Sequence, residues 1–270
     1  MGDTAVLLIA HGSPDPDWLA LVESSVPGSV ADLPVRVAFL GGVEGRSIAE
    51  EWRRLEEAGA KRIIVLPLFV TAGSGHVGEI RSMLGLEPWR QEDKERWQIP
   101  VKARILWCPP LEDHPLVEQI VEERVRTLAA NPQGESLLLV GHGSDSPMGQ
   151  AKWEKLMHRL TLRLQNKFFF AAAGYGTLRP DTLRIAAGSL SAKGELVVVP
   201  LFVSQGYYTR KGIPQRLEGL PYRYDGSAYL PHPAIAEWIR QSVRTALASD
   251  ILTQRSVYEN GRKKAVEMGG

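Results

Sequence analysis

Short apolar runs alternate with segments of helical periodicity along almost the whole chain. Four runs in each half have the length and composition of strands, at residues 5–10, 35–40, 63–66, 101–106, 137–140, 168–172, 196–199 and 222–228. Segments with helical spacing of apolar residues lie between them, at residues 18–25, 48–55, 80–84, 116–128, 150–164, 181–190, 210–217 and 234–248. Continuous apolar runs are typical of strands buried on both faces. The alternation predicts an α/β fold in which helices cover both faces of parallel sheets.

Landmarks in the first half recur in the same order in the second half. The matched segments are 10–13 with 141–144, 67–70 with 200–203 and, more loosely, 114–115 with 232–233. Three ordered landmarks favour an internal duplication. We therefore expect two tandem lobes, each a doubly wound parallel sheet, at residues 1–131 and 135–250, followed by a polar and flexible tail at 251–270.

Composition narrows the class of protein. Among the 270 residues, 44% are hydrophobic and 23% are charged, which is ordinary for a soluble globular protein. The net charge of +1 gives no reason to expect a nucleic acid or an acidic membrane as partner. The single cysteine, Cys108, excludes an internal disulfide and a cysteine-ligated iron–sulfur cluster within one chain. No apolar run approaches the ~18 residues of a membrane span, and the N-terminus lacks the pattern of a signal peptide, so we expect a cytoplasmic protein.

Two histidines follow apolar strands in the first copy. His11 comes directly after the run 5–10, and His76 follows the run 63–66 and a turn that contains Gly73 and Gly75. The first and third strands of a doubly wound sheet often end side by side, at the edge where such sheets bind ligands. Two imidazoles that meet there suggest a metal site, whereas one alone would more often bond only to its own loop.

The second copy keeps one histidine and loses the other. Counting from the shared Pro-Leu-Phe-Val segment places Thr209 at the position of His76, while His142 retains the position of His11. The same loop carries Tyr207, Tyr208, Arg210 and Lys211. Tyrosines stack on flat rings and arginines pair with carboxylates, so this copy is suited to an aromatic, acidic ligand. Ordinary packing and a solvated helix start are the competing interpretations.

Other features of the sequence have structural interpretations. His114 and His232 each precede a proline ahead of a helix, so we expect them to cap those helices. The segment 87–98 is rich in charge and tryptophan and has no counterpart in the second copy. It is either a lid near the site or a surface excursion.

The motifs together resemble a known family. Ala10-His11-Gly12-Ser13 after the first strand, Pro67-Leu68-Phe69 with His76 after the third, and the late His-Pro pairs are similar to those of the CbiX/SirB sirohydrochlorin chelatases, in their long two-domain form. The resemblance covers about residues 4–248. It implies a class II chelatase fold of two flavodoxin-like lobes. It also implies insertion of Co²⁺ or Fe²⁺ into sirohydrochlorin, for cobalamin or siroheme biosynthesis, and hence a lyase.

The resemblance also assigns residues. The family's two metal-site histidines correspond to His11 and His76. We expect contacts to the macrocycle from the loop and second-copy residues Ser13, Gly73, Ser74, Gly75, His142, Tyr207, Tyr208 and Arg210. The family usually has a glutamate after Phe-Leu at the end of the second strand, but this chain has Gly41 there. Glu44 and Glu79 are the candidate replacements, and we favour Glu44 because its glycine-rich loop leaves the strand beside those that carry the histidines.

The missing glutamate keeps a second function open. The absent glutamate favours a non-catalytic tetrapyrrole or metal carrier with a degenerate chelatase site, whereas the retained His11 and His76 favour the enzyme. A flavodoxin-like phosphate or nucleotide binder is a third, weaker alternative. For the chelatase we expect the metal ion as a substrate and no permanently bound cofactor. We also expect a monomer, because the two lobes are fused, with sirohydrochlorin and the metal as the only partners.

Overall fold

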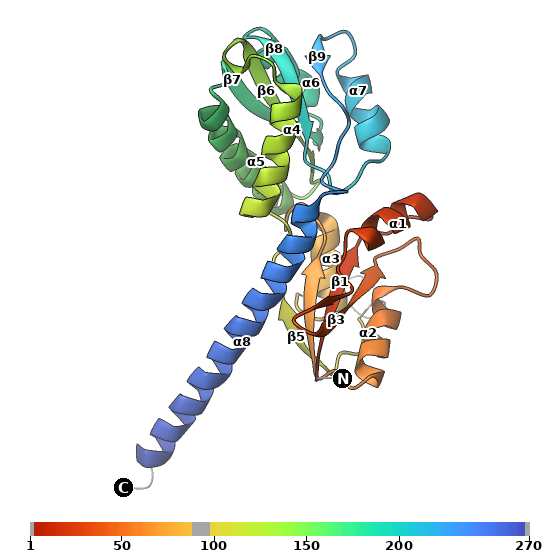
Figure 1. The fold of residues 1–270 in the computed structure, drawn as a ribbon, viewed down its shortest axis with the longest axis vertical. Coiled ribbons are helices and arrows are strands. Elements are labelled where there is room, and N and C mark those ends of the chain that lie inside the picture. The colour runs from red at the N-terminus through yellow and green to blue at the C-terminus, as the bar shows by residue number, and fades with distance from the viewer. Residues whose placement is uncertain (1–2, 88–97, 268–270) are drawn as a thin grey trace.

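The computed structural model describes residues 3–87 and 98–267, which form two α/β lobes (Figure 1). The first sheet has five strands in the order β2-β3-β1-β4-β5. Its strands are β1 (Thr4–Ala10), β2 (Ser29–Val30), β3 (Leu33–Phe39), β4 (Arg62–Pro67) and β5 (Arg104–Trp107). All neighbours are parallel except β2, which pairs antiparallel with β3. Every residue of β1 is buried, as expected for a central strand covered on both faces.

Local signals in the sequence set the helices of the first half. These are α1 (Pro16–Ser24), α2 (Ile48–Glu57), α3 (Gly75–Met83) and α4 (Pro115–Leu128). Ser47 and Glu50 form a capping box at the start of α2, which satisfies two backbone N–H groups that the helix leaves unpaired. Trp52 and Leu55 then bury the inner side of α2 against the sheet.

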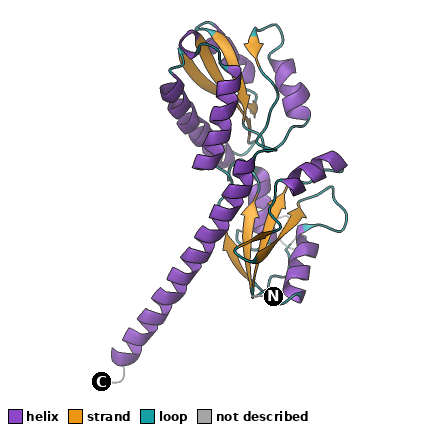
Figure 2. Cartoon of the chain, viewed as in Figure 1, coloured by secondary structure: helices purple, strands orange, loops and turns teal. Residues whose placement is uncertain are grey.

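The second half repeats this plan. Its sheet has four parallel strands in the order β7-β6-β8-β9, namely β6 (Glu135–Gly143), β7 (Ala172–Arg179), β8 (Glu195–Pro200) and β9 (Tyr222–Arg223). The α-helices are α5 (Pro147–Phe168), α6 (Leu183–Ser191), α7 (Ile213–Arg216) and α8 (Pro233–Glu267). A 3₁₀ turn, η1 (Pro132–Gly134), joins the halves, and a π-helical turn, η2 (Tyr208–Gly212), precedes α7. The predicted fold class is confirmed (Figure 2).

The last helix of each half packs on the sheet of the other half. Helix α4 contacts β8, and α8 contacts β2, β4 and β5 as it descends from the second lobe along the first (Figure 1). One hydrophobic cluster consequently runs through both lobes, from Val6 and Ile64 in the first sheet to Leu139 and Val199 in the second. Separate clusters fill the outer face of each sheet. The helix exchange therefore gives the two sheets a common core.

Several predicted boundaries differ from the structure. The strand expected at 168–172 begins at Ala172, because α5 runs on to Phe168 and ends where Phe169 takes a left-handed conformation (φ 59°). The strands expected at 101–106 and 222–228 are shorter, at Arg104–Trp107 and Tyr222–Arg223. Most of the segment expected as a flexible tail belongs to α8, which continues to Glu267; its flexibility stays a prediction.

Two further predictions concern the segment 87–98 and the absence of a membrane-spanning helix. Apart from its two end residues, the segment 87–98 lies outside the described residues. Among the helices that the structure describes, none combines the length and apolar character needed to cross a membrane.

Candidate active site

Two neighbouring strands of the first sheet bring His11 and His76 together. Strand β1 pairs with β4 up to Ile9 and Pro67, so the loops that leave both strands start side by side. His11 directly follows β1, and His76 lies in the first turn of α3. Their ring centroids are 4.8 Å apart, with the rings at 72° to each other, and both residues are exposed. The structure therefore places the two predicted metal ligands as a pair at the carboxyl edge of the sheet.

Hydrogen bonds set which ring nitrogen of each histidine is free. The Nδ1 of His11 lies 2.8 Å from the carbonyl oxygen of Gly12, which can only accept, so Nδ1 carries the proton. The Nδ1 of His76 lies 3.3 Å from Oε2 of Glu79. No hydrogen bond to another described residue involves Nε2 of either histidine. A carbonyl or carboxylate bonded to the far nitrogen is the usual means of orienting a metal-binding imidazole.

Backbone contacts bring the end of β3 to the same place. Gly12 has φ of 93°, and a Cβ added there would lie 1.8 Å from the carbonyl oxygen of Gly41. The N–H of Gly41 donates to the carbonyl oxygen of His11 over 3.1 Å. Position 41 is therefore adjacent to His11, but glycine supplies no side chain there. A glutamate at this position would lie next to the histidine pair.

The two candidate replacements differ in their surroundings. Glu79 follows His76 by three residues on α3, and a spacing of three places both side chains on the same face of a helix, where they are in contact. Glu44 is exposed, and no hydrogen bond or ion pair joins it to another described residue. The next residues of its loop are held, because Arg54 donates to the carbonyl of Gly45 over 2.7 Å and Arg46 to that of Val37 over 3.1 Å. The structure brings Glu79, and not Glu44, to the histidines.

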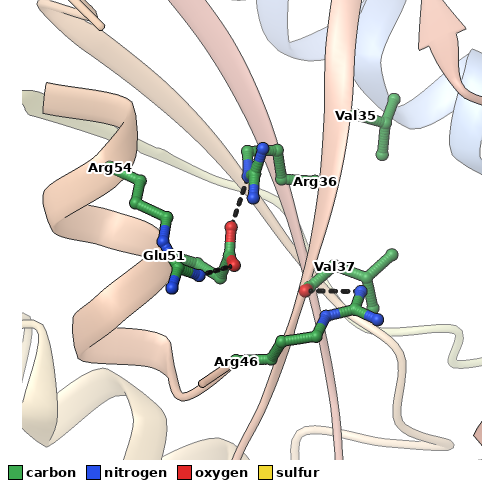
Figure 3. A pocket seen from close by; sticks show the side chains of 6 residues that line it. All are labelled: Val35, Arg36, Val37, Arg46, Glu51 and Arg54. Carbon is green, nitrogen blue, oxygen red and sulfur yellow. Dashed lines mark hydrogen bonds and ion pairs between the residues drawn. The ribbon is translucent and has the colours of Figure 1, made fainter. Parts of the chain in front are cut away.

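A cavity of about 410 Å³ lies between β3 and α2 and contains neither histidine. Its lining residues are Val35, Arg36, Val37, Arg46, Glu51 and Arg54 (Figure 3). The carboxylate of Glu51 is 1% exposed and is held by both Arg36 and Arg54. These ion pairs keep the pKa of Glu51 low, although burial alone would raise it. The arginines here neutralise a buried carboxylate and anchor the loop that carries Glu44.

The second lobe has a matching pair made of different residues. The rings of His142 and Tyr208 have centroids 5.2 Å apart and lie at 85°. The ring centroids of Phe202 and Tyr208 are 6.3 Å apart, and those of Phe69 and His76 are 6.1 Å apart. The counterpart of His76 is therefore Tyr208.

The prediction that Thr209 occupies this position is wrong by one residue. Thr209 is buried, and its hydroxyl is bonded to the backbone of Gly206. The reason lies in the loop before the helical turn: Tyr208 follows Phe202 by six positions, whereas His76 follows Phe69 by seven, so this loop is one residue shorter in the second lobe.

Arg179 is a residue of this lobe that the sequence did not single out. Gly143 has φ of 78°, and a Cβ added there would lie 1.9 Å from the carbonyl oxygen of Arg179. Arg179 is therefore the counterpart of Gly41. Its Nη1 donates to Asp145 over 3.3 Å. Burial lowers the pKa of His142, and the charges of Arg179 and His76 lower it further, so this imidazole is neutral at neutral pH.

Close contacts join the two lobes beside these two sets of residues. A Cβ on Gly73 would lie 2.5 Å from the carbonyl oxygen of Gly149, at the start of α5. Only glycine permits such an approach, so the loop before His76 is seated on the second lobe. On α1, the Nε1 of Trp18 donates to the hydroxyl of Ser204 over 2.7 Å, which joins the first lobe to the loop that leads to Tyr208.

The remaining predicted residues lie around these pairs. The hydroxyl of Ser13 accepts from the N–H of Asp15 over 3.2 Å, whereas Ser74 precedes α3 without a side-chain capping bond. Gly75, Tyr207 and Arg210 are exposed, with Tyr207 at 64%. Within the described part of the chain, no group of three or more His, Cys, Asp or Glu side chains is arranged to hold a metal ion.

The two other histidines that the sequence linked to helix starts lie at those starts. The Nδ1 of His114 accepts from the N–H of Leu116 over 3.2 Å, and that of His232 accepts from Ala234 over 3.1 Å. The Nε2 of His232 also lies 2.8 Å from Glu123 of α4. The prediction that both cap helices is confirmed, and the second one also joins α4 to α8.

Comparisons with known proteins agree with this architecture. A family model described as CbiX matches residues 5–128 and 136–246. The chain is 29% identical over 136 residues to a sirohydrochlorin cobaltochelatase of Methanopyrus kandleri, which covers 45% of this chain and 94% of that protein. It is 25% identical over 228 residues to a probable sirohydrochlorin cobaltochelatase of Halobacterium salinarum, covering 78% of this chain and 75% of the relative. Among solved structures, SirB from Bacillus subtilis with Fe³⁺ superimposes with a TM-score of 0.68 at 17% identity, covering 92% of this chain and 96% of that one.

Proposed function

The chain belongs to the CbiX family, and from this membership and the site we propose that it inserts a divalent metal ion, Co²⁺ or Fe²⁺, into sirohydrochlorin. The observation that carries the proposal is the pair formed by His11 and His76, with ring centroids 4.8 Å apart at the carboxyl edge of the first sheet. The curated relatives support cobalt by name, and the SirB structure contains iron. The choice between the metals is left to experiment.

His11 and His76 are the metal-binding residues in this proposal. In each, Nδ1 is bonded to the Gly12 carbonyl or to Glu79, and Nε2 bonds to no other described residue, so Nε2 is the proposed metal-binding atom. Imidazole suits borderline divalent ions such as Co²⁺ and Fe²⁺. Both residues are exposed, so the ion keeps open coordination positions on the side away from the protein. Those positions let the pyrrole nitrogens replace water before the histidines release the ion.

Proton removal accompanies insertion, since two pyrrole N–H groups must lose their protons. Glu79 is the carboxylate beside the metal-binding pair, and it can accept a proton directly or through His76. Its charge also offsets part of the charge of the cation. Glu44, which the sequence favoured, stays a prediction, because reaching the histidines would require its loop to move.

The second lobe supplies the surface for the macrocycle. Tyr207 and Tyr208 offer aromatic faces and edges, with ring centroids 5.6 Å apart, and His142 stands beside Tyr208. Ser13, Ser74, Gly75 and Arg210 lie on the loops around the two pairs and are proposed to contact the ligand. Gly73 acts by seating its loop on α5.

Other parts of the proposal rest on the sequence. We take residues 1–131 as the metal-binding lobe and 135–250 as the macrocycle-binding lobe, although their cores are continuous. The protein is proposed to act as a cytoplasmic monomer on sirohydrochlorin and a free metal ion, without a permanently bound cofactor. Gel filtration with light scattering tests the monomer.

The proposal is tested by following the absorbance of sirohydrochlorin with Co²⁺ or Fe²⁺, against the rate without protein. We expect several turnovers per protein molecule and loss of the protein-dependent rate in His11→Ala and His76→Ala. A wild-type rate equal to the uncatalysed rate with both metals would refute it.

One observation favours a second candidate, a non-catalytic tetrapyrrole or metal carrier. Gly41 places no carboxylate beside His11, where the family usually has one. A carrier binds sirohydrochlorin and metal but produces at most one equivalent of product, so turnover number separates the two functions.

A further inference from the structure

The two lobes differ most at the ends of β3 and β7. The backbone is the same in both, because Gly12 lies against the carbonyl of Gly41 and Gly143 against that of Arg179. In the first lobe this position has no side chain. In the second it carries a guanidinium group, which lies in the same part of the lobe as His142 and Tyr208.

The guanidinium of Arg179 has spare hydrogen-bonding capacity. Its side chain is 54% exposed, and its Nη1 donates to Asp145, whose side chain is 76% exposed. The pKa of Arg179 is raised first by this bond and then by the nearby phenol of Tyr208. Arginine presents five N–H donors in a fixed fork that matches a carboxylate. An exposed ion pair of this kind contributes little to stability, so a ligand can replace Asp145.

We propose that Arg179, together with the hydroxyl of Tyr208, binds a carboxylate substituent of the tetrapyrrole. The proposal rests on the chelatase function and names the residue that orients the substrate in it. The contact of Gly73 with Gly149 holds the loop before His76 against the second lobe, and the charge of His76 acts on His142, so the two pairs lie near each other. A macrocycle anchored by its rim to Arg179 therefore has its ring available to the first lobe.

The residue that faces this position in each lobe explains why the second lobe can carry an arginine here and the first cannot. At the equivalent place in the first lobe, a guanidinium would stand beside His11 and repel the metal ion. In the second lobe the facing imidazole is the neutral His142, whose pKa is lowered mainly by burial, and Asp145 offsets part of the arginine's charge. The duplicated site thus separates cation binding from carboxylate binding.

The alternative is that Arg179 only steadies its own loop through Asp145. Two variants separate the possibilities: Arg179→Gln removes the guanidinium, and Asp145→Asn removes its partner while leaving Arg179 in place. Arg53→Gln is the matched control, because Arg53 is also exposed, at 64%, and also makes one exposed ion pair, with Glu57 over 3.1 Å.

The experiment is a fluorescence titration of each variant with metal-free sirohydrochlorin, with thermal unfolding as the folding check. We expect Arg179→Gln to raise Kd about tenfold, the size expected for loss of a charge-assisted hydrogen bond. Arg179→Lys should fall between Arg179→Gln and wild type, because it keeps the charge without the fork. Asp145→Asn should bind as tightly as wild type or tighter, and Arg53→Gln should be unchanged.

Two results would overturn the proposal: a wild-type Kd in Arg179→Gln, or an equal loss of affinity in Asp145→Asn, which would assign Arg179 to its loop. If the proposed chelatase function is wrong, the wild-type protein itself gives a different result. Wild-type protein would then bind no macrocycle or show no metal insertion, whereas an active wild type with an unchanged Kd in Arg179→Gln refutes the role of Arg179 alone.

Discussion

The first and second lobes present the same backbone with different side chains. His11 and His142 each end a central strand and bond through Nδ1 to the next carbonyl, and the glycine after each lies against the end of a neighbouring strand. Opposite them stand His76 in one lobe and Tyr208 in the other. A duplication has therefore kept the geometry of the loops, which depends on glycine, while the chemistry of the facing positions has diverged. Two imidazoles suit a cation, whereas a phenol with a nearby arginine suits an anion.

Replacing one histidine in each lobe breaks this comparison most directly. His76→Ala removes one of the two proposed metal ligands and should lower the metal insertion rate by ~100-fold or more, in keeping with the loss of a group that acts on the reacting centre. His142→Ala should lower it by less than ~10-fold, because its partner is Tyr208. Steady-state rates at limiting Co²⁺ measure both. Equal losses in two folded variants would mean that the metal is bound by both lobes.

The conserved backbone gives the second prediction. Alanine at Gly12 or Gly143 places a Cβ within 1.8 or 1.9 Å of a carbonyl oxygen and occupies a positive φ. Each substitution should cost about 2–3 kcal/mol of unfolding free energy, as expected for strain combined with a clash. Urea unfolding of the two variants measures the cost. Gly28→Ala is the control, since a Cβ there meets nothing within 4 Å. A mild effect at only one of the two positions would show that the loops are not equivalent.

An ion-pair network between the halves tests whether they act as one body. Asp113, just before α4, accepts from Arg159 and Arg163 of α5, and the bond from Arg159 is the main reason that its pKa falls from 3.8 to about 2. A lowered pKa stabilises the fold above the unfolded value and loses that contribution as the pH falls towards 2. Asp113→Asn should therefore lower the unfolding free energy by about 1–2 kcal/mol at pH 7, an upper estimate from the size of the shift.

The pH dependence is the control for this effect. The difference between wild type and Asp113→Asn should shrink between pH 4 and pH 2, where the wild-type carboxylate becomes protonated. A constant difference over that range in denaturant titrations would contradict the assignment to charge.

The smallest expected effect concerns the two glutamates. Glu79→Gln keeps a hydrogen-bonding partner near His76 but removes the charge and the proposed proton acceptor, so the insertion rate should fall by ~10-fold. Glu44→Gln should change the rate by less than ~3-fold, because no hydrogen bond or ion pair joins Glu44 to a described residue of the candidate site. The opposite ranking would restore Glu44 as the proton acceptor and require its loop to move inward.

Part of this account could be predicted from the sequence. His11 and His76 were identified because each follows a clear apolar run and because the repeat supplied a second copy for comparison. The counterpart of His76 was placed at Thr209 instead of Tyr208, since a count from Phe202 does not reveal that the loop is one residue shorter in the second lobe. Arg179 was missed because its strand contains Gly174 and Gly176, which let the sheet approach α6 but interrupt the apolar pattern.

The helix exchange was also not foreseen. Helices α4 and α8 have the apolar spacing of ordinary amphipathic helices, and this spacing does not specify which sheet they cover. That choice depends on contacts between distant segments, such as the bond from His232 to Glu123.

Equilibrium binding of Co²⁺ without sirohydrochlorin tests the central claim, that the metal belongs to the first lobe. The measurement is calorimetric titration of wild type, His76→Ala and His142→Ala, with the Co²⁺ absorption bands reporting nitrogen ligation. We expect one site in wild type, its loss or a ~100-fold weaker affinity in His76→Ala, and an affinity within ~3-fold of wild type in His142→Ala. Unchanged binding in His76→Ala, or loss of binding in His142→Ala, would contradict the division of roles between the lobes.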